Sequence, residues 1–437
     1  MADQAVSQPI RGVASPTLHR VILLSERLAR LTWPGQTAVV VAYTAIVTLV
    51  WGFALDSFAA GFAAALVGFV FIAIDWIGLA LLPQRRRSFG PVAPGLVLFG
   101  GIRCALSVAL AILARYSDIA AILLLCGHLA LTGYALDSMW GEPFRVGVTR
   151  LTYRSPKLDG LPPLRIAHLS DFHVERLTQR EAKVLALLDE MRPDMIVYTG
   201  DLLSYSYIDD PVAQAECRAL MSRLHAPLGV FAVPGTPLVD TETALQNVLG
   251  DLGNVTLLRD CVVSLPQCPS IKLIGLSCTH NPAIDASNLD SVVDGLAPGD
   301  YTILLYHAPD LMPEAARLGI DLVLCGHTHG GQIRLPLFGA VFTSSIYGKR
   351  YEMGEYREGG TTMVVSRGIG MEGKGMPRMR FLCEPEIELI ELRGTLEAEE
   401  ALGDTAPASY RARPRFNLPA TQSLYAPESI APMKARP

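Results

Sequence analysis

The sequence predicts a layered α/β domain that follows a region of four membrane-spanning helices. Three observations point to this organisation. Four long apolar stretches lie in the first third of the chain, strand-like and helix-like segments alternate after residue 146, and metal-ligating side chains follow several of these strands. At 437 residues the chain is long enough for more than one unit.

The composition is more apolar than that of an average soluble enzyme. Half of the residues are hydrophobic, 18% are charged, and the mean hydropathy is +0.31. This balance indicates membrane spans and membrane lipids as partners. The net charge of -5, without a strongly basic tract, gives no sign of nucleic-acid binding. None of the eight cysteines forms a Cys-x-x-Cys pair, so we interpret them as buried free thiols in a reducing compartment.

The N-terminal segment, residues 1–36, begins polar and then becomes arginine-rich. It lacks the short apolar core and cleavage pattern of a removed signal peptide. The apolar stretches that follow are each near the ~20 residues needed to cross a bilayer, and their short loops favour an antiparallel arrangement. We predict four transmembrane helices within 37–138, at about 37–55, 58–82, 95–114 and 118–138.

Loop charges predict the orientation of these spans. The N-terminal segment, the connection with Arg85, Arg86 and Arg87, and the exit after the fourth span are rich in basic residues, whereas the alternate connections are not. Positively charged loops stay in the cytoplasm. We therefore expect a multi-pass protein of the inner (cytoplasmic) membrane, N-in and C-in, with the domain after the spans in the cytoplasm.

Two charged residues, Asp75 and Arg103, lie inside apolar stretches, where charge is costly and often functional. One interpretation is that both snorkel to the cytoplasmic interface. The alternative is a charge pair between the two helices that contacts a lipid headgroup.

From about residue 146 the pattern changes to alternating strands and helices, which is typical of an α/β domain. The segment 144–153 is predicted as an edge strand, and helices are predicted at 179–191 and near 212–224. Further strands are predicted at 164–169, 195–199, 229–233, 272–276, 301–306, 322–325, 362–366 and 386–392. The tail, 394–437, is rich in alanine, proline and arginine, which favours disorder.

Candidate metal ligands follow four of these strands. They are Asp171 and His173, then Asp201, then His307, and finally His327 and His329. His327 and His329 are two residues apart, so on an extended backbone both imidazoles would project the same way. Open α/β sheets place their sites where strands end, and oxygen plus imidazole ligands suit Mn, Fe or Zn. Each residue also has a plain alternative, such as a helix cap, a turn residue or a core histidine, but the joint pattern predicts a metal site.

The order Asp-x-His, Gly-Asp, a lone His and Gly-His-Thr-His-Gly-Gly-Gln resembles the calcineurin-like metallophosphoesterases, in particular their membrane-associated bacterial YkuE-type branch. The resemblance covers about residues 146–393, and Arg334-Leu335-Pro336 and Arg367-Gly368-Ile369-Gly370 fit it too. It implies a four-layer α/β/β/α sandwich and two divalent metal ions, Mn, Fe, Zn or Mg, that activate a bridging water and clamp phosphoryl oxygens.

Carried over by position, the resemblance implies that Asp171, His173, Asp201 and His329 hold one metal. Asp201, His307 and His327 would hold the other, with Asp201 and His307 at the catalytic positions. Arg334 and Arg367 are candidate substrate contacts because guanidinium groups suit phosphate oxygens; the alternative is that both are solvated surface arginines.

One family motif is degraded. Where the family has Gly-Asn-His-Asp or Gly-Asn-His-Glu, this chain has Gly235-Thr236-Pro237-Leu238. Thr236 is expected to bind the second metal more weakly than asparagine does, and Pro237 donates no proton, so general-acid help worth roughly 10²–10⁴-fold would be absent. His280 also follows a strand; it either replaces the missing imidazole or is an ordinary loop histidine.

Two functions are therefore predicted. The first is a membrane-anchored, metal-dependent phosphoesterase that hydrolyses a phosphoester or pyrophosphate-linked substrate, lipid-linked substrates included, at the cytoplasmic face of the membrane. The second is a catalytically silent metal- or phosphate-binding module that regulates a process at the membrane.

Overall fold

The computed structural model describes residues 27–265, 267–373, 375 and 377–396. The first 26 residues of the N-terminal segment and residues 397–437 of the tail lie outside this range. The predictions of a cytoplasmic N-terminal segment and a disordered tail therefore concern mainly residues outside the described part.

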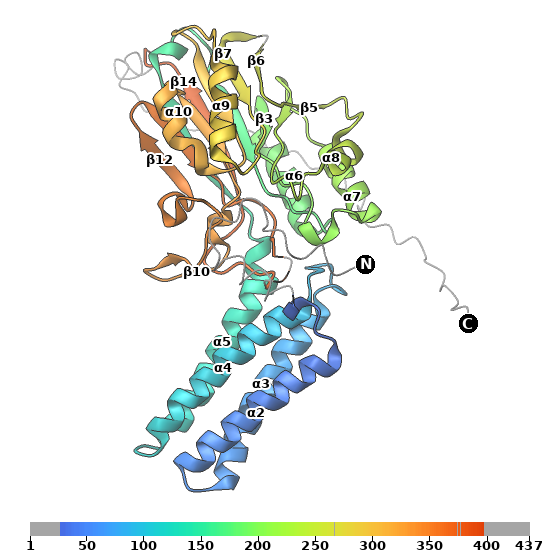
Figure 1. Ribbon diagram of the computed structural model, residues 1–437, viewed down its shortest axis with the longest axis vertical. Helices are drawn as coiled ribbons and strands as arrows, with labels where there is room; N and C mark the ends of the chain where they lie inside the picture. The colour runs from blue at the N-terminus through green and yellow to red at the C-terminus, as the bar shows by residue number, and fades with distance from the viewer. Residues whose placement is uncertain (1–26, 266, 374, 376, 397–437) are drawn as a thin grey trace, which may run out of the picture. The chain divides into compact units, whose positions relative to one another are not determined.

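Four long apolar helices run side by side in the N-terminal region (Figure 1), and each is long and apolar enough to cross a membrane. They are α2 (Trp33–Ala54), α3 (Phe58–Leu81), α4 (Val92–Ala114) and α5 (Ile119–Leu136). The helix α2 begins four residues before the predicted start, with Pro34 in its first turn, where proline is favoured. After α5 a single π-helical turn, Asp137–Gly141, continues the apolar helix toward the α/β part of the chain.

The two charged residues inside the spans do not snorkel, because both Asp75 and Arg103 are about 1% exposed. The Arg103 guanidinium donates to both carboxylate oxygens of Asp75, at 2.7 and 2.8 Å. It also donates to Thr132 Oγ1 at 2.7 Å and to the carbonyl oxygen of His128 at 2.9 Å. These hydrogen bonds between α3, α4 and α5 satisfy both charges inside the helix bundle. Neither side chain therefore needs to extend to the membrane interface to find a polar partner.

Two six-stranded sheets form the centre of the α/β part. The first has the order β1 (Gly147–Arg154), β14 (Glu386–Arg393), β2 (Leu164–Leu169), β3 (Met195–Tyr198), β4 (Val230–Ala232) and β5 (Val255–Leu257). The second has the order β12 (Gly354–Glu358), β13 (Thr361–Val365), β9 (Leu322–Cys325), β8 (Tyr301–Leu305), β7 (Cys268–Gly275) and β6 (Cys261–Leu265). The segment predicted as an edge strand is β1, at one edge of the first sheet.

Helices cover the outer face of each sheet, which gives four layers. A core of apolar side chains joins the first sheet to α6 (Gln179–Met191), α7 (Pro211–Met221) and α8 (Glu242–Leu249). A second core lies between the sheets, with Ile166 and Val197 from one sheet packed against Leu305 and Leu324 from the other. A third joins the second sheet to α9 (Pro282–Val293) and α10 (Met312–Leu318), both labelled in Figure 1. The fold is thus the predicted α/β/β/α sandwich, preceded by the four apolar helices.

Most pairings inside the sheets are parallel. The strands β2, β3 and β4 are parallel neighbours in the first sheet, and β7, β8 and β9 are parallel neighbours in the second. Their carboxyl ends therefore meet at one edge of each sheet, and loops from both sheets can converge there. A small antiparallel hairpin, β10 (Arg334–Leu335) and β11 (Gly339–Ala340), follows the loop after β9.

All eight cysteines are free, as predicted, but they are not all buried. Cys126 is exposed on α5, and Cys104 and Cys261 are half-buried. The prediction of burial was wrong for Cys126 because a helix in a four-helix bundle turns part of its surface outward, where apolar side chains face lipid in a membrane protein.

Candidate metal centre

The six candidate ligands converge at the carboxyl ends of four strands. Asp171 and His173 follow β2, Asp201 follows β3, His307 follows β8, and His327 and His329 follow β9. They form two groups in which the potential ligand atoms lie within 4.8 Å of one another. The first group holds Asp171, His173 and His329, and the second holds Asp201, His307 and His327.

In the first group, two imidazole nitrogens face each other across a small gap. The Nε2 atoms of His173 and His329 are 3.0 Å apart, and the two rings are stacked. A carboxylate oxygen of Asp171 lies 3.8 Å from the His173 nitrogen and 3.6 Å from the His329 nitrogen. Two buried nitrogens at this distance share at most one proton, so a cation between them and the carboxylate satisfies the set better.

In the second group, too, a carboxylate oxygen and imidazole nitrogens lie close to one another. His307 Nε2 lies 3.3 Å from Asp201 Oδ2 and 3.1 Å from His327 Nδ1. The same Asp201 oxygen is 3.6 Å from His173 Nε2 in the first group. Asp201 therefore lies between the two groups, the position that a ligand shared by two metals requires.

Neighbouring acceptors orient two of the histidines. His307 Nδ1 lies 2.6 Å from the carbonyl oxygen of Thr199, so Nδ1 donates its N–H to that oxygen and the ring turns Nε2 toward Asp201. His173 Nδ1 lies 2.9 Å from a Glu372 carboxylate oxygen and 3.2 Å from the Leu203 carbonyl oxygen. Metal-bound histidines usually donate their second N–H to such oxygens, which fixes the ring.

The electrostatics of the cluster favour a positive charge at its centre. Burial by itself lowers the pKa of His307, but the negative charge of Asp201 outweighs it and raises this pKa to about 10. Burial likewise opposes the shift at His173, where the charge of Glu372 raises the pKa to about 9. Burial and the positive charge of His173 instead hold the pKa of His329 well below its usual range, so its imidazole stays neutral with a free lone pair.

The backbone at the cluster adopts a conformation that costs free energy. Five of the six candidate ligands, all except His307, have positive φ angles between 42° and 69°. Non-glycine residues rarely adopt such angles, and where they do they concentrate at functional sites. This corrects one expectation, because His327 and His329 follow β9 in a loop and not on an extended strand. Their imidazoles consequently enter different groups.

Glycines allow the loops to approach one another. A Cβ at Gly235 would collide with Asp201, and a Cβ at Gly326 would collide with the carboxylate of Asp171 and the hydroxyl of Ser170. Any side chain at these two positions would push the β4 and β9 loops away from the carboxylates.

Thr236 occupies the position expected for the metal-binding asparagine. Its backbone N–H donates to Asp201 Oδ1 at 2.6 Å, and its hydroxyl lies 3.1 Å from Asp201 Oδ2 and 3.2 Å from His307 Nε2. The hydroxyl thus faces the second group, where a neutral hydroxyl is a poorer ligand than an amide oxygen.

His280 lies against the second group. Its ring centroid is 4.8 Å from that of His327, and its Nε2 is buried without a hydrogen-bond partner in the described part of the chain. An unpartnered buried nitrogen is costly, so this arrangement favours the interpretation that His280 supplies an imidazole to the site over that of an ordinary loop residue.

The two arginines proposed as substrate contacts are both engaged by carboxylates. Arg334 lies 2.9 Å from Glu352, and Arg367 lies 2.6 Å from Glu386. Contact with a phosphate would require either guanidinium to exchange or share its partner, so their role in substrate binding stays a prediction.

Sequence reasoning missed two carboxylates, Glu372 and Asp240. Asp240 accepts hydrogen bonds from the backbone N–H groups of Asp201, Leu202 and Gly235, at 2.8 to 3.0 Å, and so ties the β3 and β4 loops together. Its signal was present: the motif acid is replaced by Leu238, and an aspartate follows two residues later. Glu372 lies beyond the matched Arg367–Gly370 segment, and nothing local marks it.

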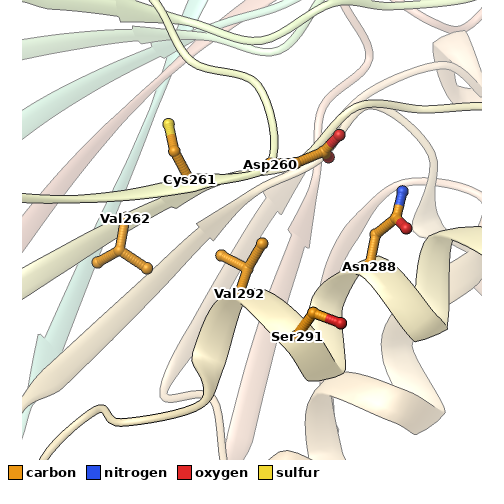
Figure 2. Close-up of a pocket in the computed structure, with 6 residues that line it drawn as sticks. All are labelled: Asp260, Cys261, Val262, Asn288, Ser291 and Val292. Atoms are coloured by element: carbon orange, nitrogen blue, oxygen red, sulfur yellow. The ribbon is translucent and has the colours of Figure 1, made fainter.

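Figure 2 shows the lining of a pocket of about 440 Å³ in the α/β part of the chain. It is formed by the residues Asp260, Cys261 and Val262 around the start of β6 and by Asn288, Ser291 and Val292 of α9. None of the six candidate ligands lines it.

Comparison with known proteins bears on the chemistry of the cluster. No family model matches the chain. The uncharacterized metallophosphoesterase YkuE of Bacillus subtilis is 32% identical over 261 residues, which cover 58% of this chain and 88% of YkuE. The phosphodiesterase YaeI of Escherichia coli is 28% identical and covers 54% of this chain and 84% of its own length.

A third relative is the UDP-2,3-diacylglucosamine pyrophosphatase LpxG of Chlamydia trachomatis, which is 27% identical over 57% of this chain and 90% of its own length. The family implies divalent metal ions, and the donor set of the cluster, two carboxylates and four imidazoles with an unpartnered buried nitrogen on His329, fits such ions. The similarity to YkuE over most of that protein's length, with the predicted motif residues gathered at one site, shows that the chain belongs to the metallophosphoesterases.

Proposed function

We propose that this chain is a membrane-anchored, metal-dependent hydrolase of phosphoester or pyrophosphate-linked substrates, lipid-linked substrates among them. The observation that carries the proposal is the convergence of six ligand-type side chains into two groups that share Asp201. Two bound divalent cations, Mn, Fe, Zn or Mg, would supply a water of lowered pKa and would stabilise charge on the phosphoryl oxygens.

The residues of this chain would prepare the site for that chemistry. Asp171, His173 and His329 would hold one cation and His307 and His327 the other, with Asp201 shared. The Thr199 carbonyl keeps the His307 imidazole in the orientation and tautomer that present Nε2 to the centre. The Thr236 amide holds one oxygen of Asp201, which leaves the other oxygen to face both groups.

The loss of the motif histidine, at the position of Pro237, favours substrates whose leaving group needs no proton donor. Pro237 has no proton to donate to a departing alkoxide, whereas a pyrophosphate linkage releases a phosphate that needs little such help. LpxG, by its name, cleaves a pyrophosphate in an acylated sugar nucleotide. The apolar helices support a lipid-linked substrate of this kind for the present chain.

Contacts between the spans and the catalytic part support the proposed cytoplasmic location. The loop between α3 and α4, which carries Arg85–Arg87, meets the domain that follows the fourth span. The Phe89 N–H donates to Glu175 at 2.7 Å, and Tyr207 donates to the Phe89 carbonyl at 2.7 Å. Both segments thus belong on one side of the membrane, which the arginines predict to be the cytoplasmic side.

The test uses the full chain purified in detergent, with metal content measured by mass spectrometry and hydrolysis of a soluble aryl phosphodiester measured with added Mn²⁺. We expect bound metal and turnover, and a loss of at least about 100-fold in Asp201→Asn. The exposed Asp209, eight residues along the chain, provides the matched control Asp209→Asn, which should keep full activity. Bound metal without turnover on any phosphoester would instead favour the silent regulatory module, for which Thr236 and Pro237 are the specific evidence.

A further inference from the structure

Exposed apolar side chains of the phosphoesterase part concentrate in one short segment, residues 335–346, which we term the apolar hairpin segment. Six of the ten large exposed hydrophobic residues described between 146 and 393 lie in it: Leu335, Leu337, Phe338, Val341, Phe342 and Ile346. The other four are Val212, Leu238, Ile284 and Leu382. Scattered exposed apolar residues need no explanation, but a contiguous group marks a surface that contacts something else.

The tip of the hairpin keeps its apolar residue at a conformational cost. The turn between β10 and β11 is closed by the Phe338 N–H, which donates to the Leu335 carbonyl at 3.2 Å. Leu337 lies within this turn with φ of 65° and its side chain fully exposed. Glycine or asparagine suits such a backbone better, and the leucine side chain is not buried by any part of the chain that the structure describes. Neither the backbone conformation nor burial among the described residues accounts for a leucine at this position.

The base of the hairpin is joined to the ends of the apolar helices. Ile333, at the start of the hairpin, is bridged to Phe381, and both pack in a cluster with Leu82 and Met139. Phe381 also contacts the Tyr134 ring edge-on, with centroids 5.7 Å apart. Leu82 is the first residue after α3, and Tyr134 is near the end of α5. These are the levels at which spans of about 20 residues leave the hydrocarbon core.

The chemistry around the segment is that of a membrane interface. Lys349 places its ammonium 3.9 Å from the centre of the Phe338 ring, and Trp140 and Tyr134 lie at the base. Interfacial segments combine inserted apolar side chains with aromatic residues and basic residues at headgroup level. Because the base of the segment packs against the ends of α3 and α5, these contacts favour the bilayer that the two helices would span over a protein partner.

We propose that the apolar hairpin segment inserts into the lipid leaflet nearest the phosphoesterase part. The partner of this surface is thus the acyl-chain and interfacial region of phospholipids. Arg334, the first residue of β10, donates to the Gly330 carbonyl at 2.7 Å, which couples the hairpin to the loop of His329. Insertion would hold the metal cluster against the membrane surface, where the phosphate of an amphiphilic substrate lies. This consequence for substrate access rests on the proposed function, whereas insertion itself does not.

Insertion is tested with the full chain reconstituted in phosphatidylcholine nanodiscs, with an environment-sensitive fluorescent amino acid placed at position 337. The matched control carries the same amino acid at position 284, because Ile284 is similarly apolar and 49% exposed but lies on α9. We expect a blue-shifted emission at 337 and at least about twofold stronger quenching by lipids with a nitroxide at acyl carbon 5. Equal, water-like emission at both positions would overturn the proposal. A blue shift that depends on protein concentration, without lipid quenching, would indicate a second copy of the chain and would also overturn it.

The consequence for catalysis is tested with Leu337→Asp combined with Phe338→Asp, and with Ile284→Asp as control. The probes are a phosphatidyl p-nitrophenyl diester in vesicles and a soluble aryl diester. We expect the KM for the vesicle probe to rise about tenfold while kcat/KM for the soluble probe and the metal content stay unchanged. An unchanged KM for the vesicle probe would refute the role in substrate access. If the proposed function is wrong, the parent chain will hydrolyse neither probe. The lipid-quenching experiment would then still test insertion by itself.

Discussion

Thr236 stands where the family motif has an asparagine, whose amide oxygen would add a ligand to the second group. Its hydroxyl already faces Asp201 and His307, at 3.1 and 3.2 Å. An asparagine at this position would place a stronger oxygen ligand in the same space. We therefore predict that this one side chain limits the affinity of the second group for a metal ion.

We predict that Thr236→Asn raises the affinity of the second metal by about tenfold or more, in the range seen when single residues around a metal are changed. Titration of the metal-free protein with Mn²⁺, followed by calorimetry, measures the effect. Thr236→Val removes the hydroxyl at equal size and should weaken the same site. If both variants bind the second metal as the parent does, the β4 loop has been assigned to the wrong role.

His280 provides the second prediction at this scale. If its imidazole serves the departing group in place of the motif histidine, His280→Ala should slow hydrolysis of diesters with poor leaving groups by about 10²-fold or more and spare those with good ones. Metal content should not change, since His280 belongs to neither ligand group. A uniform loss on every diester, or a loss of metal, would assign His280 a structural role.

At the scale of elements, the polar contacts among α3, α4 and α5 hold the apolar bundle in one arrangement. Arg103 uses its guanidinium to join Asp75 of α3 to His128 and Thr132 of α5. We predict that Arg103→Leu lowers stability by about 3–5 kcal/mol, because it leaves the Asp75 carboxylate buried without its partner.

The double variant Asp75→Leu with Arg103→Leu should recover most of this loss, since apolar replacement of a whole buried pair is often neutral. Thermal unfolding of the full chain in detergent, followed by the fluorescence of Trp51 and Trp76, measures both variants. Equal destabilisation by the single and the double variant would show that the pair does not act as a unit.

Elements with strong local signals were predicted most closely. The bounds of β2, α6 and β9 agree with the prediction, because β2 and β9 are short and almost fully buried and α6 begins with a Thr178–Glu181 capping box. Strands β5, β6 and β12 were missed, since they are strands with half-buried residues and weak alternation. The insertion of β14 between β1 and β2 was also beyond local patterns, because it depends on contacts more than 200 residues apart.

The positions of the candidate ligands were predictable because they follow strands with strong local signals. Asp171, Asp201, His307 and His329 each follow a buried strand, and the parallel order of the strands brings strand ends together. The left-handed backbone at five ligands and the contributions of Glu372 and Asp240 were not predictable, because they arise from the packing of loops against one another.

At the scale of the whole molecule, the orientation in the membrane is the main open prediction. Loop arginines predict that the N-terminus, the Arg85–Arg87 loop and the phosphoesterase part, residues 146–393, are cytoplasmic. Fluorescent-protein fusions after residue 394 should fluoresce, and alkaline phosphatase should be active when fused at Ser57 or Ser117. Replacement of Arg85, Arg86 and Arg87 by alanine should weaken this preference. The reverse pattern of reporter activity would place the metal cluster outside the cytoplasm.

The place of β14 in the first sheet has a consequence for how the protein is made. β1 leaves the translating ribosome shortly after the fourth span, but the strand that pairs with it on its inner side, β14, begins only at Glu386. During most of synthesis β1 is therefore an unpaired strand, and unpaired strands tend to pair with other nascent chains. A chain terminated before residue 386 would lack β14, which lies between β1 and β2, so its first two strands would no longer be joined in one sheet.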